Sequence, residues 1–417
     1  MKKSSKGITL IALVITIIIL LILAGISIAT FTNTGLFGKA KEAKEKSENA
    51  QKQENTILLD YEEKIGKING SNRENNDYTM LGIPVTKGNG TKENPYIITE
   101  ATQLNAISII QNTENLYIKL GNDIDLSTIC YQVDGTTTND ISWNPIGSIS
   151  NPFQGTLDGD GHKISNIYIN STESNQGLFS CIGKKATIKN ITINGKFQVQ
   201  GGYTGGFTGI NYGIIDNCEN DISISNINSH GYDTGGIAGH NLGIIYRCRN
   251  KKDITSAGEA TGGIAGINAG ENGTGFIIEC INNGNIHGDS YCTGGIASAN
   301  ANFNINANGY ICNSYNTGTI TGGANKRAGI VGQIKYNGGN TYIYNCYNKG
   351  DIQGCPDIIG WDGGNGTSTV LNSYGISQAT VEKLNTKSDI EKALKDTNLY
   401  RENAWKLKDG NIILDWE

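Results

Sequence analysis

The distribution of apolar and polar residues divides the chain into three parts, and the first is an uncharged run near the N-terminus. Ile8 to Ala29 are 22 consecutive residues without a charged side chain. A helix of this length covers about 33 Å, enough to cross a hydrocarbon core of about 30 Å. Lys2, Lys3 and Lys6 precede the run, which favours a cytoplasmic N-terminus. The pattern predicts a single-pass transmembrane helix over residues 8–30, with the bulk of the chain extracellular.

The second part is polar and helical in composition. Residues 31–66 are dominated by Ala, Lys, Glu and Gln, which are good helix formers. Leu58, Tyr61 and Ile65 form only a narrow apolar stripe. We expect a polar stalk helix, with a partner-packing helix as the alternative. Residues 67–90 are rich in Asn and Gly and are predicted to be a linker.

The third part repeats two landmarks with one period of about 30 residues. The first is Thr-Gly-Gly followed by an apolar residue, with degenerate copies at 327–330 and 359–361. The second is a segment of the form x-Cys-x-Asn, with a partial copy at 372–374. Two landmarks that keep the same spacing indicate internal repeats. The recurring residues are Gly206, Gly236, Gly263 and Gly295, then Cys218, Cys248, Cys280 and Cys346, then Asn220, Asn250, Asn282, Asn316 and Asn348.

Short β-branched stretches bounded by Gly or Asn lie between the landmarks, for example Ile214-Ile215 and Ile244-Ile245. A unit of about 30 residues with three short strands cannot bury its inner face alone, but stacked copies can. The pattern predicts a mainly β chain, a right-handed parallel β-solenoid with coils about 4.8 Å apart. The cysteines would stack inside it. The asparagines would form a ladder at a turn, where Asn tolerates left-handed backbone.

Solenoids need atypical ends that cover their open coils. We expect residues 91–170 to form an N-terminal cap and the first coils, because Leu104, Ile107 and Ile110 are spaced as on a helix. Residues 171–378 would hold the repeats. Residues 379–417 would form a C-terminal cap, with a charged helical stretch and a final short strand.

Composition narrows the classes of partner and of chemistry. Charged residues are 18% of the chain and the net charge is -5, which excludes the broad basic face that nucleic-acid binding needs. The sequence has 56 glycines and 51 asparagines, so the backbone must turn often. Nine cysteines contain no Cys-x-x-Cys pair. Stacked buried thiols explain them, with a disulfide between adjacent coils as the alternative. An odd count leaves one unpaired, and Cys355 is the candidate.

Candidate catalytic and metal residues are few. Asp158, Asp160 and His162 could be an acid/base cluster, but the neighbouring glycines favour a tight turn. Asp123 and Asp125 could bind calcium, although packing at a strand end fits this short spacing better. The zinc-protease, serine-hydrolase and phosphate-loop motifs are missing. We therefore predict no catalytic residue, no metal site and no cofactor.

The N-terminal residues Lys6-Gly7-Ile8-Thr9-Leu10-Ile11 resemble the prepilin processing motif of type IV pilins and type II secretion pseudopilins. The resemblance implies that a prepilin peptidase removes residues 1–7, cutting after Gly7, and that Ile8 becomes the methylated first residue. The family normally has glutamate where this chain has Ala12. That departure argues against a major pilin and leaves a minor pilin-like or pseudopilin-like component of a filament, or a simple anchor. Ordinary signal-peptide cleavage after Ala29 is the alternative.

The repeats resemble the GLUG motif, a repeat of bacterial surface proteins, over residues 87–417. Supporting segments precede the repeats at 90–96, 101–104, 123–126, 143–147 and 153–162. The resemblance implies a secreted or surface-exposed chain.

These observations together predict a membrane-anchored, surface-displayed protein with a non-enzymatic binding, adhesion or structural role. A glycan or another cell-surface ligand is the expected partner, beside the membrane itself. An extracellular polysaccharide lyase or hydrolase on a β-helix scaffold is the alternative. Seven tyrosines could stack on sugar rings, namely Tyr203, Tyr212, Tyr232, Tyr246, Tyr291, Tyr310 and Tyr347.

Overall fold

The computed structural model describes residues 79–80, 83–132, 140–228, 232–270, 273–301, 306–323, 325–335, 338–364, 366–386, 391, 394 and 397–417. All of them belong to one compact unit, residues 77–417. The predicted leader, transmembrane helix and stalk lie outside the described residues. Within the described part of the chain, no helix has the length and apolar character needed to span a bilayer.

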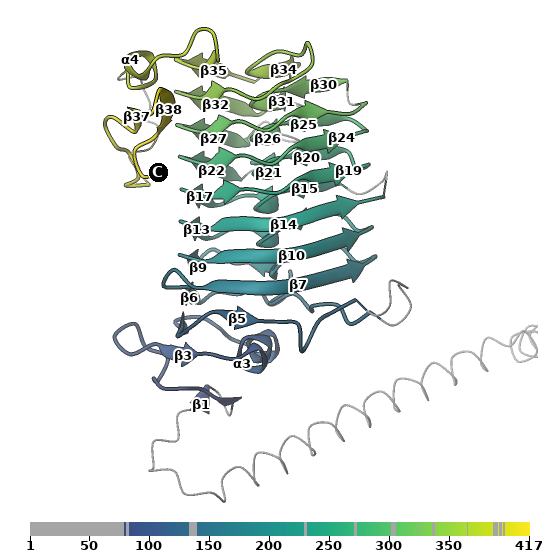
Figure 1. The fold of residues 1–417 in the computed structure, drawn as a ribbon, viewed down its shortest axis with the longest axis vertical. Helices are drawn as coiled ribbons and strands as arrows, with labels where there is room; N and C mark the ends of the chain where they lie inside the picture. The colour runs from purple at the N-terminus through teal and green to yellow at the C-terminus, as the bar shows by residue number, and fades with distance from the viewer. Residues whose placement is uncertain are drawn as a thin grey trace, which may run out of the picture. The chain divides into compact units, whose positions relative to one another are not determined.

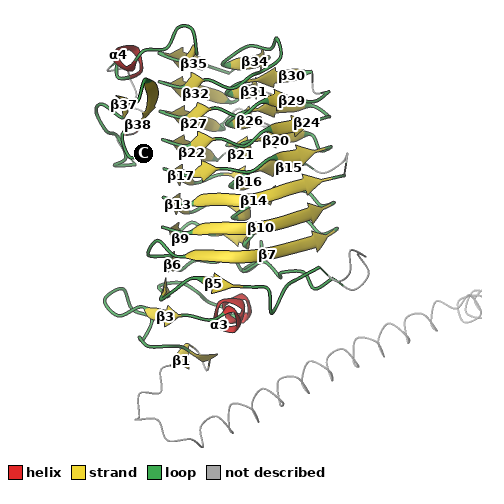
Figure 2. Ribbon diagram, viewed as in Figure 1, coloured by secondary structure: helices red, strands yellow, loops and turns green. Residues whose placement is uncertain are grey.

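The described residues form a right-handed parallel β-solenoid, so the predicted fold is confirmed for this part of the chain. Figures 1 and 2 show the strands of successive coils lying one above the next. Each of the five coils between Thr204 and Asn348 passes through four parallel sheets, where the sequence predicted three strands. We name them sheets 1 to 4 in the order in which the chain enters them from Thr204.

Sheets 1 and 2 meet at the Thr-Gly-Gly landmark. Sheet 1 has five strands, β11 (Thr204–Gly205), β15 (Asp233–Gly235), β20 (Ala260–Gly262), β25 (Cys292–Gly294) and β30 (Lys326–Ala328). Sheet 2 has seven strands, β8 (Phe179–Ile182), β12 (Thr208–Asn211), β16 (Ala238–Asn241), β21 (Ala265–Asn268), β26 (Ala297–Asn300), β31 (Val331–Ile334) and β34 (Ile359–Asp362).

Sheets 3 and 4 meet at the x-Cys-x-Asn landmark. Sheet 3 has ten strands, β3 (Tyr96–Ile98), β4 (Tyr117–Leu120), β6 (Thr156–Asp158), β9 (Thr187–Lys189), β13 (Ile214–Asp216), β17 (Ile244–Tyr246), β22 (Thr274–Ile278), β27 (Asn308–Cys312), β32 (Asn340–Tyr344) and β35 (Ser368–Leu371). Sheet 4 has twelve strands, β5 (Ile124–Asp125), β7 (Lys163–Ser171), β10 (Thr192–Val199), β14 (Glu219–Asn226), β18 (Arg249–Asn250), β19 (Ile254–Ser256), β23 (Ile281–Asn282), β24 (Ile286–Gly288), β28 (Tyr315–Asn316), β29 (Ile320–Thr321), β33 (Tyr347–Asn348) and β36 (Tyr374–Gly375).

The core is a set of vertical columns in which apolar side chains lie in register. In sheet 3, isoleucine stacks on isoleucine from Ile188 through Ile215, Ile245, Ile277 and Ile311 to Ile343, all fully buried. Each coil therefore supplies one layer of a core that it could not bury alone, which is the source of stability expected of a stacked repeat.

The N-terminal end of the solenoid is covered. Helix α3 (Ala101–Ala106) and the 3-10 turn η1 (Ile107–Ile109) bury Leu104 and Ile107, and Ile110 follows them into the core. Gln103 donates a hydrogen bond to the carbonyl of Pro84 at 3.0 Å. Within the predicted linker over 67–90, β1 (Thr79–Met80) and β2 (Ile83–Pro84) form an antiparallel pair.

The C-terminal end differs from the prediction. Val370 continues the isoleucine column of sheet 3, yet 37% of its surface is exposed. The described residues after 379 include α4 (Val381–Leu384) and the hairpin β37 (Trp405–Lys408) and β38 (Asn411–Leu414). They pack along the side of several coils, against sheets 3 and 4, instead of capping the last coil. Figure 1 shows the hairpin beside the stack. We call residues 380–417 the flanking segment.

Candidate functional site

The predicted processing residues Gly7 and Ile8 lie outside the described residues. The predicted glycine column, Gly206, Gly236, Gly263 and Gly295, lies at the turn between sheets 1 and 2. A Cβ on Gly263 would stand 2.1 Å from the Gly295 carbonyl oxygen and 2.4 Å from the Asn282 amide carbon. Glycine is required there by this close approach, and the same holds in each coil of the column.

The predicted asparagine ladder is a continuous chain of amide hydrogen bonds. Each Nδ2 donates to the Oδ1 of the next coil at 2.7–2.9 Å, and every rung is buried. These residues lie in strands of sheet 4, not at a left-handed turn as predicted. The left-handed position comes three residues earlier, for example at Asn217, where φ is 50°. The ladder residues are Asn220, Asn250, Asn282, Asn316 and Asn348.

A second asparagine ladder at the end of sheet 2 was missed by the sequence analysis. Asn211, Asn241, Asn268 and Asn300 are buried and connect Nδ2 to Oδ1 at 2.7–2.8 Å. Its signal was present in the sequence, because each of these asparagines stands five residues after the second glycine of a Thr-Gly-Gly landmark. Both ladders use the repeated polar residues to join one coil to the next.

The predicted cysteine column is buried beside the first ladder. Cys248 and Cys280 each donate to the carbonyl two residues before them, at 3.2 and 3.3 Å. Burial raises the pKa of both thiols well above its ordinary value. All nine cysteines are free thiols, and Cys355 is the one that is not fully buried. Ser314 takes the place of cysteine between Cys280 and Cys346.

The corner between sheets 3 and 4 is formed by a column of left-handed residues, and two of them break the pattern. Five coils place asparagine there, but Arg247 and Glu279 occupy the same corner with φ of 52°. Left-handed backbone costs about 1–2 kcal/mol for most residues and less for asparagine. The two charged residues therefore need a compensating contact. The asparagines of this column are Asn190, Asn217, Asn313, Asn345 and Asn372.

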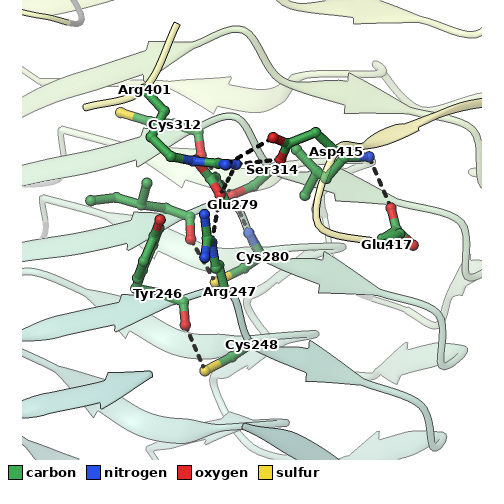
Figure 3. Close-up of polar contacts among 12 residues, drawn as sticks. Tyr246, Arg247, Cys248, Glu279, Cys280, Cys312, Ser314, Arg401, Asp415 and Glu417 are labelled. Atoms are coloured by element: carbon green, nitrogen blue, oxygen red, sulfur yellow. Dashed lines mark hydrogen bonds and ion pairs between the residues drawn. The ribbon is translucent and has the colours of Figure 1, made fainter. Parts of the chain in front are cut away.

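That contact comes from the flanking segment, as Figure 3 shows. Glu279 has a fully buried carboxylate that accepts from Arg247 Nε at 3.0 Å. Arg401 donates to the same carboxylate through Nε at 2.8 Å and Nη2 at 2.7 Å. Its other edge pairs with Asp415. We call Arg247, Glu279, Arg401 and Asp415 the corner cluster.

The contacts within the corner cluster favour the ionised forms of Arg401 and Asp415. Burial alone would lower the pKa of Arg401, but hydrogen bonds to Asp415 and Glu279 raise it above its ordinary value. Burial would raise the pKa of Asp415, and Arg401 outweighs it and holds that pKa below the usual range. Charge-assisted pairs with two-point geometry are the strong class of hydrogen bond. The cluster therefore fixes the flanking segment at one place on the solenoid.

Aromatic packing extends the same interface. Trp405 lies 5.7 Å from the ring of Tyr315 and 6.4 Å from that of Tyr347. Arg249 pairs with Glu417 at 2.7 Å, and the Tyr315 hydroxyl donates to the same carboxylate at 2.9 Å. Outward residues of sheets 3 and 4, which are polar in the early coils, are thus apolar where the flanking segment covers them.

A groove of about 650 Å³ remains between the hairpin β37–β38 and sheet 4. Its lining includes Arg249, Lys349 and Lys408 together with Thr317 and Trp416. Lys349 donates to the side-chain oxygen of Asn411, a neutral group, at 2.7 Å. This volume lies within the range of about 300–1,000 Å³ typical of ligand sites.

The acidic residues singled out in the sequence lie at the early end of the same corner. Asp160 and Gly161 have φ of 53° and 85°, so the predicted tight turn is present. Asp158 and Asp160 pair with Lys189 and Lys119 at 2.9 and 2.8 Å. His162 lies 3.2 Å from Asp123, in an exposed position. Across the described residues, no three His, Cys, Asp or Glu side chains gather closely enough to hold a metal ion.

The seven tyrosines do not form one surface. Tyr246 and Tyr347 are buried beneath the flanking segment, and Tyr310 lies within a stack with Phe276 and Tyr342 at 4.8 and 4.5 Å. Tyr203 stacks on Tyr232 near sheet 1 at 5.7 Å. Tyr291 lies over the Lys326 ammonium at 3.6 Å, and Tyr212 is half-buried.

Comparison with known proteins gives partial likenesses. No protein-family model matches this chain. A protein of Evansella cellulosilytica named "Putative Gly-rich membrane protein" is 39% identical over 191 residues, which are 45% of this chain and 21% of that protein. "Halomucin" of Haloquadratum walsbyi is 36% identical over 129 residues, 29% of this chain and 1% of that protein. The chain therefore spans about a fifth or less of the length of these relatives.

One solved structure is similar in fold. It is the crystal structure of a "putative immunoglobulin A1 protease" from Bacteroides ovatus, with a TM-score of 0.48 and 24% sequence identity. The alignment covers 81% of this chain and 97% of that one. A likeness of this degree concerns the fold alone.

Proposed function

We propose that this protein is a membrane-anchored β-solenoid displayed on the cell surface, with a non-enzymatic binding or structural role. The observation that carries the proposal is the use made of the repeated polar residues. Both asparagine ladders join coil to coil through buried amides, and the repeated cysteines bond to backbone carbonyls. The repeated residues therefore build a rigid surface. The outward side chains that differ from one coil to the next remain for contacts outside the coil.

Membrane attachment is supported by the uncharged run from Ile8 to Ala29 and by the name of the Evansella cellulosilytica relative. We also propose processing after Gly7, on the resemblance of residues 6–11 to the prepilin motif, with filament subunits as partners of the processed chain. Mass spectrometry of the native protein tests this. A mature chain that begins at Ile8 supports it, and one that begins at Thr30 indicates ordinary secretion.

Surface display is tested by adding protease to intact cells. We expect the solenoid to be removed from unbroken cells, with a short membrane-bound remnant left behind. A solenoid that is cleaved only after the cells are lysed would contradict surface display.

The non-enzymatic role is tested by incubating the purified full-length chain with acidic polysaccharides. Metal-dependent depolymerisation of the polysaccharide would contradict that role.

A further inference from the structure

We propose that a polar cavity between the flanking segment and the solenoid binds a calcium ion through amide and carboxylate oxygens. The cavity has a volume of about 170 Å³ and lies at the corner between sheets 3 and 4, with Arg401 of the corner cluster in its wall. We call it the corner cavity. The inference goes beyond the proposed function, because it concerns a metal site that holds two parts of the chain together.

Two buried asparagines carry the main argument. Asn313 and Asn345 belong to the left-handed corner column and line the corner cavity, and only 3% and 5% of their surfaces are exposed. The side-chain carbonyl oxygen of each is buried and has no hydrogen-bond partner among the described residues. Buried polar atoms without partners are rare in native proteins, and each needs an explanation. Two of them on one cavity indicate that the cavity takes a ligand that bonds to carbonyl oxygens.

The same corner column shows a different arrangement in the early coils, which the flanking segment does not cover. There Asn217 donates from Nδ2 to the Oδ1 of Asn190 at 2.8 Å, as in a ladder. Asn313 and Asn345 also occupy neighbouring coils, but neither donates to the other, because both Oδ1 atoms lack a partner. The late asparagines therefore depart from the column pattern at the place where the cavity lies, and both carbonyl oxygens remain for a ligand.

The charges around the corner cavity favour a cation. Arg401 lines the cavity, but its guanidinium is bonded to Glu279 on one edge and to Asp415 on the other. Together with Arg247, the corner cluster contains two cations and two carboxylates, so it carries no net charge. Glu402 is the other charged residue of the lining and adds one carboxylate. Carbonyl oxygens and a carboxylate are the ligands that hard cations prefer.

The spacing of the coils favours calcium over magnesium. Calcium bonds to oxygen at about 2.3–2.6 Å, so an ion between two oxygens spans about 4.6–5.2 Å. Neighbouring strands are about 4.8 Å apart, which lets one ion contact the carbonyls of Asn313 and Asn345. Magnesium bonds at about 2.0–2.1 Å in near-ideal octahedral geometry, and it would span only about 4.2 Å.

The rest of the lining agrees with a weak calcium site. The Asn403 side chain also lines the corner cavity, and no cysteine or histidine does, so the site offers nothing to a softer metal. A site with one carboxylate and neutral oxygens should bind calcium with a Kd of about 10⁻⁴–10⁻³ M, the range of extracellular modules. No sequence motif marks these residues, which is why the sequence predicted no metal site.

The test is a titration of the full-length chain with Tb³⁺, which replaces calcium and emits light when a nearby aromatic ring is excited. Tyr400 lines the corner cavity and can serve as this ring. We expect emission that saturates at one ion per chain and that Ca²⁺ reverses at lower concentration than Mg²⁺ does. Asn313→Gly/Asn345→Gly removes both carbonyl oxygens and keeps the left-handed backbone, which glycine adopts readily. It should weaken binding about tenfold or more, and Glu402→Gln should weaken it to a smaller degree.

The matched control is Asn190→Gly/Asn217→Gly, which changes the same left-handed column outside the corner cavity and should bind Tb³⁺ as the native chain does. Thermal unfolding verifies that each variant is folded. A second measurement uses the native chain alone: calcium should slow hydrogen exchange at residues 400–404, which lie in the cavity wall. Emission that does not saturate, equal reversal by Mg²⁺, unchanged binding by both cavity variants, or exchange that does not respond to calcium would overturn the proposal.

Discussion

The interior of the solenoid and its outer corner between sheets 3 and 4 follow opposite rules. Inside, the same residue recurs from coil to coil, as in the ladder from Asn220 to Asn348. At the corner, asparagine gives way to Arg247 and Glu279 in two adjacent coils, and the flanking segment binds there. The repeated asparagines contact their own copies, whereas Glu279, which departs from the repeat at the corner, contacts Arg401 of the flanking segment.

The sharpest way to break this comparison is to remove the carboxylate of Glu279. Glu279→Ala leaves Arg247 and Arg401 facing each other without their shared anion, and breaking a buried pair costs about 3–5 kcal/mol. We expect the flanking segment to detach while the coils stay folded. Hydrogen exchange should then show loss of protection confined to residues 397–417 and the surface beneath them.

Glu219→Ala is the matched control, because Glu219 forms an ion pair with Lys251 at 2.6 Å that is more exposed. Such pairs contribute about 0–1 kcal/mol, so its exchange pattern should resemble that of the native chain. Loss of coil protection in Glu279→Ala would mean that the corner and the interior are not separable.

An interior rung should show the reverse behaviour. Asn282→Ala removes one buried amide and takes one of two hydrogen-bond partners from both Asn250 Nδ2 and Asn316 Oδ1, which keep their bonds to Lys252 and Gly318. Buried polar groups that lose a partner cost about 1–3 kcal/mol. We expect the free energy of unfolding to fall by about 2–3 kcal/mol, measured by denaturant titration. The neighbouring Asn283→Ala lies on the exposed side of the same coil and should change it by less than about 0.5 kcal/mol. Equal effects at both positions would contradict a structural role for the ladder.

Acid should act on the corner before it acts on the interior ladders. Arg401 holds the pKa of Asp415 below its ordinary value. The ionised Asp415 carboxylate therefore stabilises docking fully at pH values above the pKa that this group has in the unfolded chain. The stabilisation is lost as the pH falls through the lower pKa that the group has in the folded chain. We expect docking of the flanking segment on the solenoid to be constant from pH 7 to 5 and to weaken below about pH 4. Tryptophan fluorescence measures this docking. Asp415→Asn should flatten this dependence, and an unchanged acid transition in that variant would assign it elsewhere.

The smallest effect is expected for a cysteine-to-serine change in the cysteine column, because one coil already has serine at that position. Ser314 occupies the rung between Cys280 and Cys346, and its hydroxyl donates to the Cys312 carbonyl at 2.9 Å. Cys248→Ser should therefore shift the free energy of unfolding by about 1 kcal/mol or less. A large loss, seen as a lower thermal midpoint, would mean that the thiol column contributes more than its backbone hydrogen bonds.

The parts of the fold that could be predicted are those set by local repetition. The cysteine, glycine and Asn220 columns follow from spacing alone, because identical residues at one period must stack. The left-handed residue was placed on the wrong asparagine, since both Asn217 and Asn220 tolerate that backbone and spacing does not distinguish them. The Asn211 ladder was missed although its spacing from each Thr-Gly-Gly was regular.

The corner cluster could not be predicted in full. The change from asparagine to Arg247 and Glu279 was visible within the landmark itself and marks a contact outside the coil. Its partner Arg401 lies 122 residues beyond Glu279, and no periodicity connects them. The flanking segment was expected over the last coil because open ends need covers, but its apolar residues match the aromatic columns on the side of the coils instead.

The flanking segment changes how a solenoid of this kind would come apart. Coils that touch only their neighbours fray one at a time from an exposed end. Here Glu417 is bonded to Arg249 and Tyr315, and Trp405 lies against Tyr347, so one short stretch of chain ties together coils that do not touch each other. A pulling force that unfolds the last coil must first detach the flanking segment from the side of the solenoid. Unfolding under force then becomes one abrupt step instead of a gradual loss of coils from the end.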